Sequence, residues 1–287
     1  ISKCEILRER ANSVGNGPDR FPLYAIRYTL KMSFVIAVAG KGGTGKTTVS
    51  ALLIRMLTLR NAGAVLGIDA DPNSNLAEAL GFKVKEDIGS IVDAIAKNPS
   101  IVPVGMSKDR FIDYRIQTSI VENDGFDILT MGRPEGPGCY CYVNNLLRTL
   151  IKNIAQEYDY IVIDNEAGFE HLSRKTMRRA DRLLLVSDSS EAGLRAAKRI
   201  IALVKELELD IHNTALILNR TNEILLKDKI QELGVATAGV IPEDEGLLSL
   251  SRQGKSITCL EESSKAFIEV KKILDKVLEG YNKKAGG

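Results

Sequence analysis

The sequence predicts an α/β fold in which a doubly wound, mostly parallel β-sheet is flanked by helices. From Phe34 onward, apolar strand-like runs alternate with amphipathic helical runs, as in chains built from successive β-α-β units. The run 160–163 (Tyr-Ile-Val-Ile) is apolar at every position, which is typical of a strand covered by helices on both faces. Ligands of such sheets bind at the carboxyl ends of the strands, so the polar residues that end each strand are the candidates for function.

The individual elements follow from hydrophobic periodicity and turn residues. Strands are predicted at 34–39, 64–69, 126–131, 159–164, 182–187, 214–219 and 237–241. Helices are predicted at 47–60, 74–80, 89–97, 142–157, 171–179, 190–208, 222–233, 244–253 and 263–281. The last helix has an apolar stripe opposite a face of mixed charge, which favours a helix docked on the sheet over an anchor at a membrane surface.

Length and composition indicate a globular protein. The 287 residues are 26% charged and 44% apolar, with a net charge of +2. We expect residues 1–31, which are turn-rich and unpatterned, to be a non-native or disordered extension, and residues 32–287 to form a single domain. Neither a nucleic acid nor a membrane is an expected partner, because the sequence has no strong basic excess and no long apolar run. The four cysteines suit reduced thiols and a cytoplasmic location.

A glycine-rich turn between the first predicted strand and helix fits the pattern of a phosphate-binding loop. Its residues are Gly40, Lys41, Gly42, Gly43, Thr44, Gly45, Lys46, Thr47 and Thr48. Glycines let backbone N–H groups point at an anion, and the helix that follows adds the positive end of its dipole. Lys46 is then expected on the β- and γ-phosphates of ATP, and the Thr47 hydroxyl on Mg²⁺.

Lys41 is a second lysine, placed at the start of this loop. There it cannot easily fold back onto its own nucleotide, but it can reach the phosphates of a nucleotide held by a facing subunit. The loop therefore resembles the deviant Walker A motif of the nitrogenase iron protein, the cell-division and partition ATPases and the metal-insertion ATPases. That resemblance implies a P-loop ATPase that works as a nucleotide-sandwich homodimer, with Lys41 and Lys46 in catalysis.

Carboxylates end two of the predicted strands. Asp69 is a candidate to support Mg²⁺ through water and Asp71 to orient the attacking water, the alternative being an Asp-Pro-Asn turn with capping carboxylates. Asp164 ends the apolar strand 159–164 and is expected to support Mg²⁺ through water, the alternative being a helix cap. Asp71 also resembles the water-activating aspartate of the deviant Walker ATPases.

Two further positions are assigned by the resemblance rather than by their chemistry. Asn219 ends the strand 214–219, where members of this superfamily carry an Asn that recognises adenine. Pro242 lies in a segment that resembles the second adenine-side loop of the same ATPases. No role is assigned to Glu166 or His171.

Cys139 and Cys141 form a C-x-C pair in a loop rich in glycine and proline. The spacing disfavours a disulfide between them, but two thiolates can bind a soft or borderline metal. A twofold axis would supply a second pair and complete a Cys₄ site for Zn²⁺ or Ni²⁺, between which the sequence does not decide. The alternative is a pair of thiols without a ligand.

The loop 132–145 and the run 164–174 resemble those of the CooC-type accessory ATPases of carbon monoxide dehydrogenase. The resemblance covers about residues 32–280. It implies ATP-dependent insertion of nickel into apo carbon monoxide dehydrogenase or a related nickel enzyme such as acetyl-CoA synthase. Two alternatives are an iron-protein-like reductase with a bridging iron–sulfur cluster, which C-x-C spacing does not fit, and a partition or cell-division switch without metal, which leaves the cysteines idle.

Overall fold

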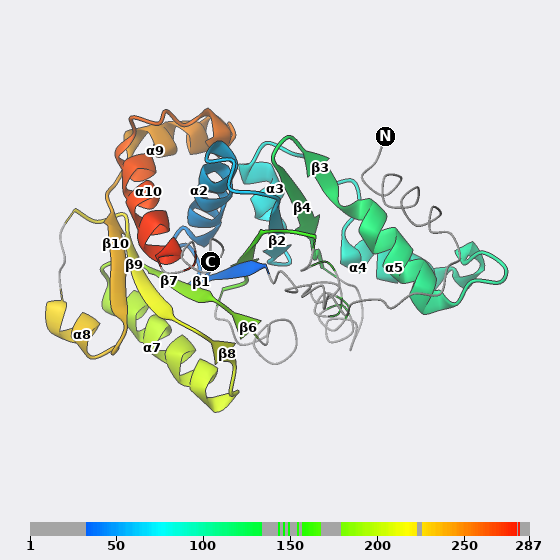
Figure 1. Cartoon of the computed structure of the whole chain (residues 1–287), viewed down its shortest axis with the longest axis horizontal. Coiled ribbons are helices and arrows are strands. Elements are labelled where there is room, and N and C mark those ends of the chain that lie inside the picture. The colour runs from blue at the N-terminus through cyan, green and yellow to red at the C-terminus, as the bar shows by residue number, and fades with distance from the viewer. Residues whose placement is uncertain are drawn as a thin grey trace, which may run out of the picture. The chain divides into compact units, whose positions relative to one another are not determined.

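The computed structural model describes residues 33–133, 157–167, 179–222, 226–279 and 281, together with the single positions 143, 146, 149 and 154. All of them lie in the unit Met32–Gly287. In this part of the chain, eight strands form one sheet in the order β10-β9-β7-β1-β5-β2-β4-β3 (Figure 1). Neighbouring strands are parallel, except that β3 pairs antiparallel with β4 at one edge. The predicted doubly wound, mostly parallel sheet is confirmed.

Each predicted strand is present, and its ends differ from the prediction by at most one residue. These strands are β1 (Phe34–Gly40), β2 (Val65–Ala70), β4 (Phe126–Thr130), β5 (Tyr160–Asn165), β7 (Arg182–Ser187), β9 (Thr214–Asn219) and β10 (Ala236–Ile241). Three short strands were not predicted: β3 (Val121–Asn123), and the pair β6 (Arg179–Ala180) and β8 (Asp210–Ile211), which form a separate two-stranded sheet. Two or three residues are too few to show an alternation of apolar and polar side chains.

Most predicted helices in the described residues are also present. They are α2 (Lys46–Leu59), α3 (Asn75–Ala79), α4 (Ile88–Lys97), α7 (Glu191–Glu206), α8 (Lys227–Gln231), α9 (Glu245–Arg252) and α10 (Lys265–Leu278). Short 3₁₀ turns lie at Pro99–Ile101 and Ile257–Cys259. The additional helix α5 (Lys108–Ser119) was not predicted, because its buried apolar positions are only Phe111, Ile112 and Ile116.

The ends of these helices lie within three residues of the predicted ends, apart from two cases. The helix expected over 171–179 is wrong at its last residue, because Arg179 lies in β6, and 171–178 lie outside the described residues. The helix expected from 222 is wrong at its start, because Asn222 lies in a bend and α8 begins at Lys227. Most of the helix expected over 142–157 also lies outside the described residues.

Helices cover both faces of the sheet, and the side chains of β1 alternate between the two faces. Ile36 and Val38 pack in the cluster that includes α2 and α10, whereas Ala37 and Ala39 pack in the cluster that includes α4 and α7. Alternate residues of a strand point to opposite faces, so a strand apolar throughout belongs to both cores. In Figure 1, α2 and α10 lie on one side of the sheet and α7 on the other.

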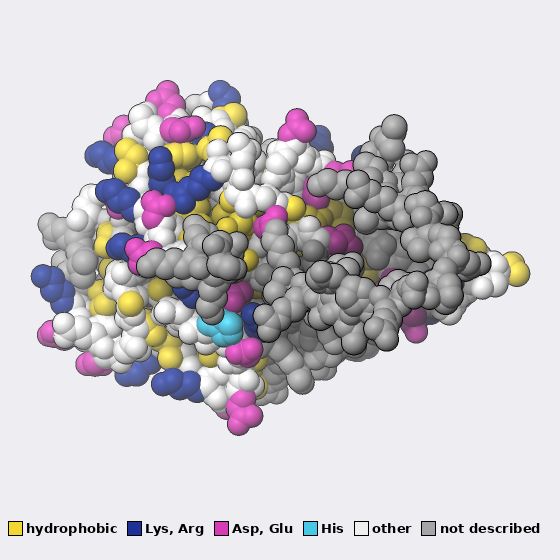
Figure 2. Space-filling view, viewed as in Figure 1, with side chains coloured by type: hydrophobic (Ala, Val, Ile, Leu, Met, Phe, Trp, Pro, Cys, Tyr) yellow, Lys and Arg dark blue, Asp and Glu magenta, His cyan; other side chains and the backbone are white. Residues whose placement is uncertain are grey.

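The last helix is docked through its apolar stripe, as predicted. α10 contacts β10 and α2, and its side chains Phe267, Val270 and Leu274 are buried. Its outer face carries mixed charge, and Figure 2 shows basic and acidic side chains interspersed over the visible face of the molecule. Among the helices of the described residues, none has both the length and the apolar character needed to cross a bilayer.

The docking of α10 predicts that alanine substitutions at two of its apolar residues lower the free energy of unfolding by different amounts. Leu274→Ala should lower the free energy of unfolding by about 2–5 kcal/mol, because Leu274 is 0% exposed and its removal leaves a cavity. The matched control is Ile268→Ala on the same helix, where the side chain is 41% exposed and the expected loss is below about 1 kcal/mol. Urea denaturation measures both, and equal losses would contradict the docking.

Candidate functional site

The predicted phosphate loop lies between β1 and α2, against the carboxyl ends of two other strands. A Cβ atom on Gly40 would lie 2.1 Å from the carbonyl oxygen of Val186 in β7. A Cβ atom on Gly45, whose φ is +91°, would lie 2.3 Å from Nδ2 of Asn219 in β9. Both distances are shorter than any ordinary contact. At Gly40 the obstacle is the backbone of β7, and at Gly45 it is the Asn219 side chain combined with a positive φ.

Lys46 is the first residue of α2, and its side chain is buried inside the loop. Its Nζ donates to the carbonyl oxygen of Lys41 at 3.4 Å, and the Thr44 hydroxyl donates to the same oxygen at 2.8 Å. Burial lowers the pKa of Lys46, and nearby carboxylates, Asp164 first among them, oppose this shift. The side chain of Lys41 is exposed. The two lysines of the loop therefore occupy different environments, one facing the carboxylates of its own chain and one facing outward.

Asp164 lies near the end of β5, and its carboxylate is hydrogen-bonded to hydroxyl groups of α2. Its Oδ1 accepts a hydrogen bond from the Ser50 hydroxyl at 3.0 Å, and it also accepts one from Thr47. Burial raises the pKa of Asp164 to about 6, and these hydrogen bonds oppose the shift. The Thr47 hydroxyl and the Asp164 carboxylate are hard oxygen ligands beside the loop, a donor set that fits Mg²⁺.

Asp69 is the register partner of Asp164 on the neighbouring strand β2, and it is 0% exposed. Its Oδ2 accepts from the Leu76 backbone N–H at 2.7 Å and its Oδ1 from the Asp71 N–H at 3.1 Å. Burial raises the pKa of Asp69 to about 7. These contacts match the capping alternative from the sequence, since the carboxylate holds the turn before α3. Its part in supporting Mg²⁺ stays a prediction.

Asp71 is only partly buried, in the turn that follows β2. Its Oδ1 accepts hydrogen bonds at 2.9 Å from both the backbone N–H and the side-chain amide of Asn73. The Asp71 carboxylate is close enough to Lys46 to oppose the lowering of that lysine's pKa. The turn thus fixes one carboxylate oxygen at the edge of the loop, and the water-orienting role of Asp71 stays a prediction.

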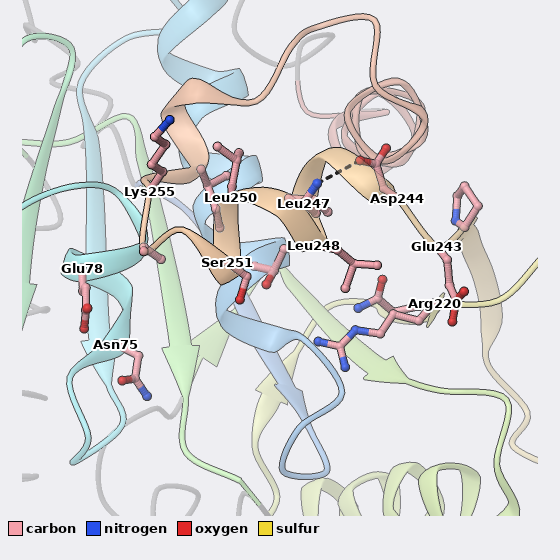
Figure 3. Close-up of a pocket in the computed structure, with 16 residues that line it drawn as sticks. Asn75, Glu78, Arg220, Glu243, Asp244, Leu247, Leu248, Leu250, Ser251 and Lys255 are labelled. Atoms are coloured by element: carbon pink, nitrogen blue, oxygen red, sulfur yellow. Dashed lines mark hydrogen bonds between the residues drawn. The ribbon is translucent and has the colours of Figure 1, made fainter.

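A cavity of about 320 Å³ adjoins the loop at the ends of β9 and β10 (Figure 3). Thr48, Asn219 and Pro242, which the sequence had proposed for nucleotide binding, all line it. Sequence reasoning missed the opposite wall, where α9 contributes Leu247, Leu248, Leu250 and Ser251. In the sequence, the leucines of α9 form an ordinary amphipathic pattern that does not distinguish a cavity wall from a core-facing stripe. In the structure, no side chain of α9 is fully buried.

One carboxylate holds the α9 wall of this cavity. Asp244 Oδ1 accepts from the backbone N–H of Leu247 in α9 at 3.0 Å, and its Oδ2 accepts from the N–H of Ala266 in α10 at 3.0 Å. A single side chain therefore caps the N-termini of two helices. The pKa of Asp244 is lowered: burial would raise it, and the hydrogen bonds from both helices outweigh that effect.

The residues predicted to bind nickel or zinc lie outside the described part of the chain. Cys139, Cys141 and also His171 belong to the ranges 134–142 and 168–178, which the structure does not describe. Within the described residues, no group of three or more His, Cys, Asp and Glu side chains is placed to hold a metal ion. Cys259 is an exposed free thiol. The C-x-C metal site therefore stays a prediction.

Stability of the nucleotide-free protein should depend on pH through Asp69 and Asp164. Burial raises the pKa of both, so the folded state binds more protons than the unfolded state between their ordinary and folded pKa values. Stability is then lost as the pH rises through about 6 and about 7, and the free energy of unfolding, measured in EDTA, should be lower at pH 8 than at pH 5. Asp164→Asn should flatten this slope, whereas Asp113→Asn on the exposed face of α5 should not; an unchanged slope in Asp164→Asn would contradict the assignment.

Comparisons with known proteins agree with this arrangement. Residues 35–257 match the family described as the CobQ/CobB/MinD/ParA nucleotide binding domain. An uncharacterised ATP-binding protein of Methanocaldococcus jannaschii is 39% identical over 249 residues, which cover 85% of this chain and 98% of that protein. The carbon monoxide dehydrogenase accessory protein CooC of Rhodospirillum rubrum is 32% identical over 190 residues, which cover 60% of this chain and 69% of that protein.

The fold has solved counterparts. The structure of the septum site-determining protein MinD of Pyrococcus horikoshii, complexed with Mg-ADP, superposes with a TM-score of 0.68 at 24% identity, covering 89% of this chain and 100% of that one. The family match spans the phosphate loop, both buried carboxylates and the cavity beside them. This chain belongs to the CobQ/CobB/MinD/ParA family of nucleotide-binding proteins and has the fold of a P-loop NTPase of the deviant Walker A class.

Proposed function

We propose that this protein is an ATPase that inserts nickel into the active-site cluster of carbon monoxide dehydrogenase or a related nickel enzyme, working in the cytoplasm as a nucleotide-sandwich homodimer. The observation that carries the metal step is the C-x-C pair Cys139 and Cys141, in a chain that is 32% identical to a carbon monoxide dehydrogenase accessory protein over 190 residues. The ATPase step is supported by the grouping of the loop, Thr47 and Asp164 at one edge of the sheet.

In this proposal the chain's own groups bind and position the reactants. The loop N–H groups and Lys46 hold the phosphates, and Thr47 and Asp164 hold Mg²⁺, which would neutralise charge developing on the phosphoryl group. Asp71, fixed by Asn73, orients a water molecule toward that group. Asn219 and Pro242 contact the base in the cavity beside the loop. Hydrolysis of this kind needs positioning and charge neutralisation rather than covalent catalysis.

Lys41 is the residue that makes the proposal depend on a dimer. Its side chain is exposed, so it is available to the phosphates of a nucleotide held by a second copy of the chain. Cations supplied across an interface in this manner accelerate phosphoryl transfer by about 10³–10⁵-fold in other NTPases.

Lys41→Ala should therefore lower kcat for ATP hydrolysis by at least about 100-fold and prevent ATP-dependent dimerisation, while ATP binding to the monomer changes little. Steady-state hydrolysis and sedimentation velocity with and without ATP measure these effects. The matched control is Lys85→Ala, an exposed lysine in the turn before α4. If Lys41→Ala hydrolyses ATP and dimerises like the wild type, the sandwich arrangement is wrong.

The cysteine pair predicts a metal stoichiometry. Two pairs across a dimer would provide four thiolates for one Ni²⁺ or Zn²⁺, so equilibrium dialysis should give about one metal ion per two chains. Replacing both Cys139 and Cys141 by Ser should abolish this binding and leave ATP binding intact. Cys259→Ser, which removes an exposed thiol elsewhere in the chain, is the control. A double variant that binds as much metal as the wild type would end the nickel proposal.

Two other functions make different predictions. An iron-protein-like reductase would purify under anaerobic conditions with bound iron and sulfide, whereas elemental analysis of the proposed protein would find nickel or zinc and no iron. A switch of the cell-division type is favoured by the fold shared with MinD, and it would co-sediment with lipid vesicles only in the presence of ATP. The apolar stripe of α10 is already buried against α2 and β10, so this stripe is not available to a membrane.

A further inference from the structure

Two consecutive residues at the end of β9 hold two consecutive carbonyl groups of the phosphate loop. Asn219 Nδ2 donates to the carbonyl oxygen of Thr44 at 2.7 Å, and Arg220 Nη1 donates to the carbonyl oxygen of Gly43 at 3.1 Å. In Figure 3, the guanidinium of Arg220 points from the end of β9 toward the loop that precedes α2. The contacts reach the loop from the side of the cavity, which both residues line.

Holding these carbonyl groups also fixes the direction of two N–H groups. A peptide group is planar and trans, so its C=O and its N–H point in opposite directions. With the carbonyl oxygens of Gly43 and Thr44 drawn toward β9, the N–H groups of Thr44 and Gly45 point away from β9, across the loop. In the structure, the Thr44 N–H donates a long hydrogen bond to the Lys41 carbonyl oxygen at 3.4 Å, which a phosphate oxygen would replace. Converging N–H groups of this kind form the anion-binding part of a phosphate loop.

The backbone of Arg220 is held in a conformation that an arginine adopts at a cost. Its φ is +57°, in the left-handed region, where a residue with a Cβ is less stable by about 1–2 kcal/mol. The next residue, Thr221, is held by a hydrogen bond from its N–H to the carbonyl oxygen of Ile241 at 3.2 Å. Glycine would adopt this backbone conformation without strain, so the turn alone does not explain an arginine at position 220. Strained residues of this kind concentrate at functional sites.

We propose that Arg220 is a positioning residue of the phosphate loop: its guanidinium, together with the Asn219 amide, turns the Thr44 and Gly45 N–H groups toward a bound polyphosphate. The proposal rests on the proposed function only in requiring that the loop bind a nucleotide. Arg220 acts through the loop and not on the base. Arg220 should therefore affect the binding of the phosphate groups, and this effect should not depend on the nucleoside.

Arg220→Gly tests this assignment, because glycine removes the side chain and also relieves the left-handed strain. We expect affinity for ATP and for inorganic tripolyphosphate, measured by calorimetry, to fall by the same factor of about tenfold, which is the loss of one good hydrogen bond. The urea midpoint should stay the same or rise, because the strain is removed. Arg220→Lys retains a donor on a shorter side chain and should recover part of the affinity for both ligands.

Glu208→Gly is the matched control. Glu208 is an exposed residue after α7 with φ +50°, so the change relieves the same backbone strain away from the loop and should leave both affinities unchanged. Wild-type affinity in Arg220→Gly would overturn the proposal, as would a loss for ATP with none for tripolyphosphate, which would mean that Arg220 contacts the nucleoside. A lower urea midpoint with unchanged affinities would show a merely structural role. Failure of the wild type itself to bind ATP would instead overturn the proposed function.

Discussion

The site depends on the close approach of the phosphate loop to two strands that are distant from it in sequence. Gly40 lies against the carbonyl group of Val186, and Gly45 lies against the Asn219 amide, with no room for a Cβ atom at either contact. The strand order β9-β7-β1 brings these three chain segments side by side. The shape of the loop is therefore set by the sheet on which it rests, and a change in the packing of β7 or β9 would reach the loop directly.

Much of the fold was predictable because parallel strands buried on both faces have a strong signature. β5 is apolar at each of its first four residues and was located to within one residue, as were the other long strands. Parallel strands end at a common edge, so locating the strands also located Asp69, Asp164 and Asn219 at that edge. The loop could be recognised for a different reason: its function requires particular residues at fixed spacing within a short stretch.

The parts that sequence reasoning missed depend on weak patterns or on contacts between distant positions. α5 buries only three apolar side chains, too few for a clear helical stripe, and β3 has three residues. The Ser50 hydroxyl reaches a carboxylate 114 residues away, and Arg220 reaches a carbonyl group 177 residues away. No local pattern marks either residue, because an ordinary helical serine and an ordinary arginine after a strand have the same sequence context. Such contacts become visible only when the chain is folded.

The contact between the Lys46 ammonium and the Lys41 carbonyl oxygen bears on how the loop meets a ligand. Lys46 and Thr44 bind that oxygen from within the loop, while Asn219 and Arg220 hold the loop from β9. The conformational entropy of these residues is thus lost during folding and not during binding. A polyphosphate would replace two long contacts to the Lys41 carbonyl oxygen, those from the Lys46 ammonium and the Thr44 N–H, both at 3.4 Å, with contacts to its own oxygens. Such a loop behaves as a preorganised receptor, in which differences in affinity between related ligands arise mainly from their rates of dissociation.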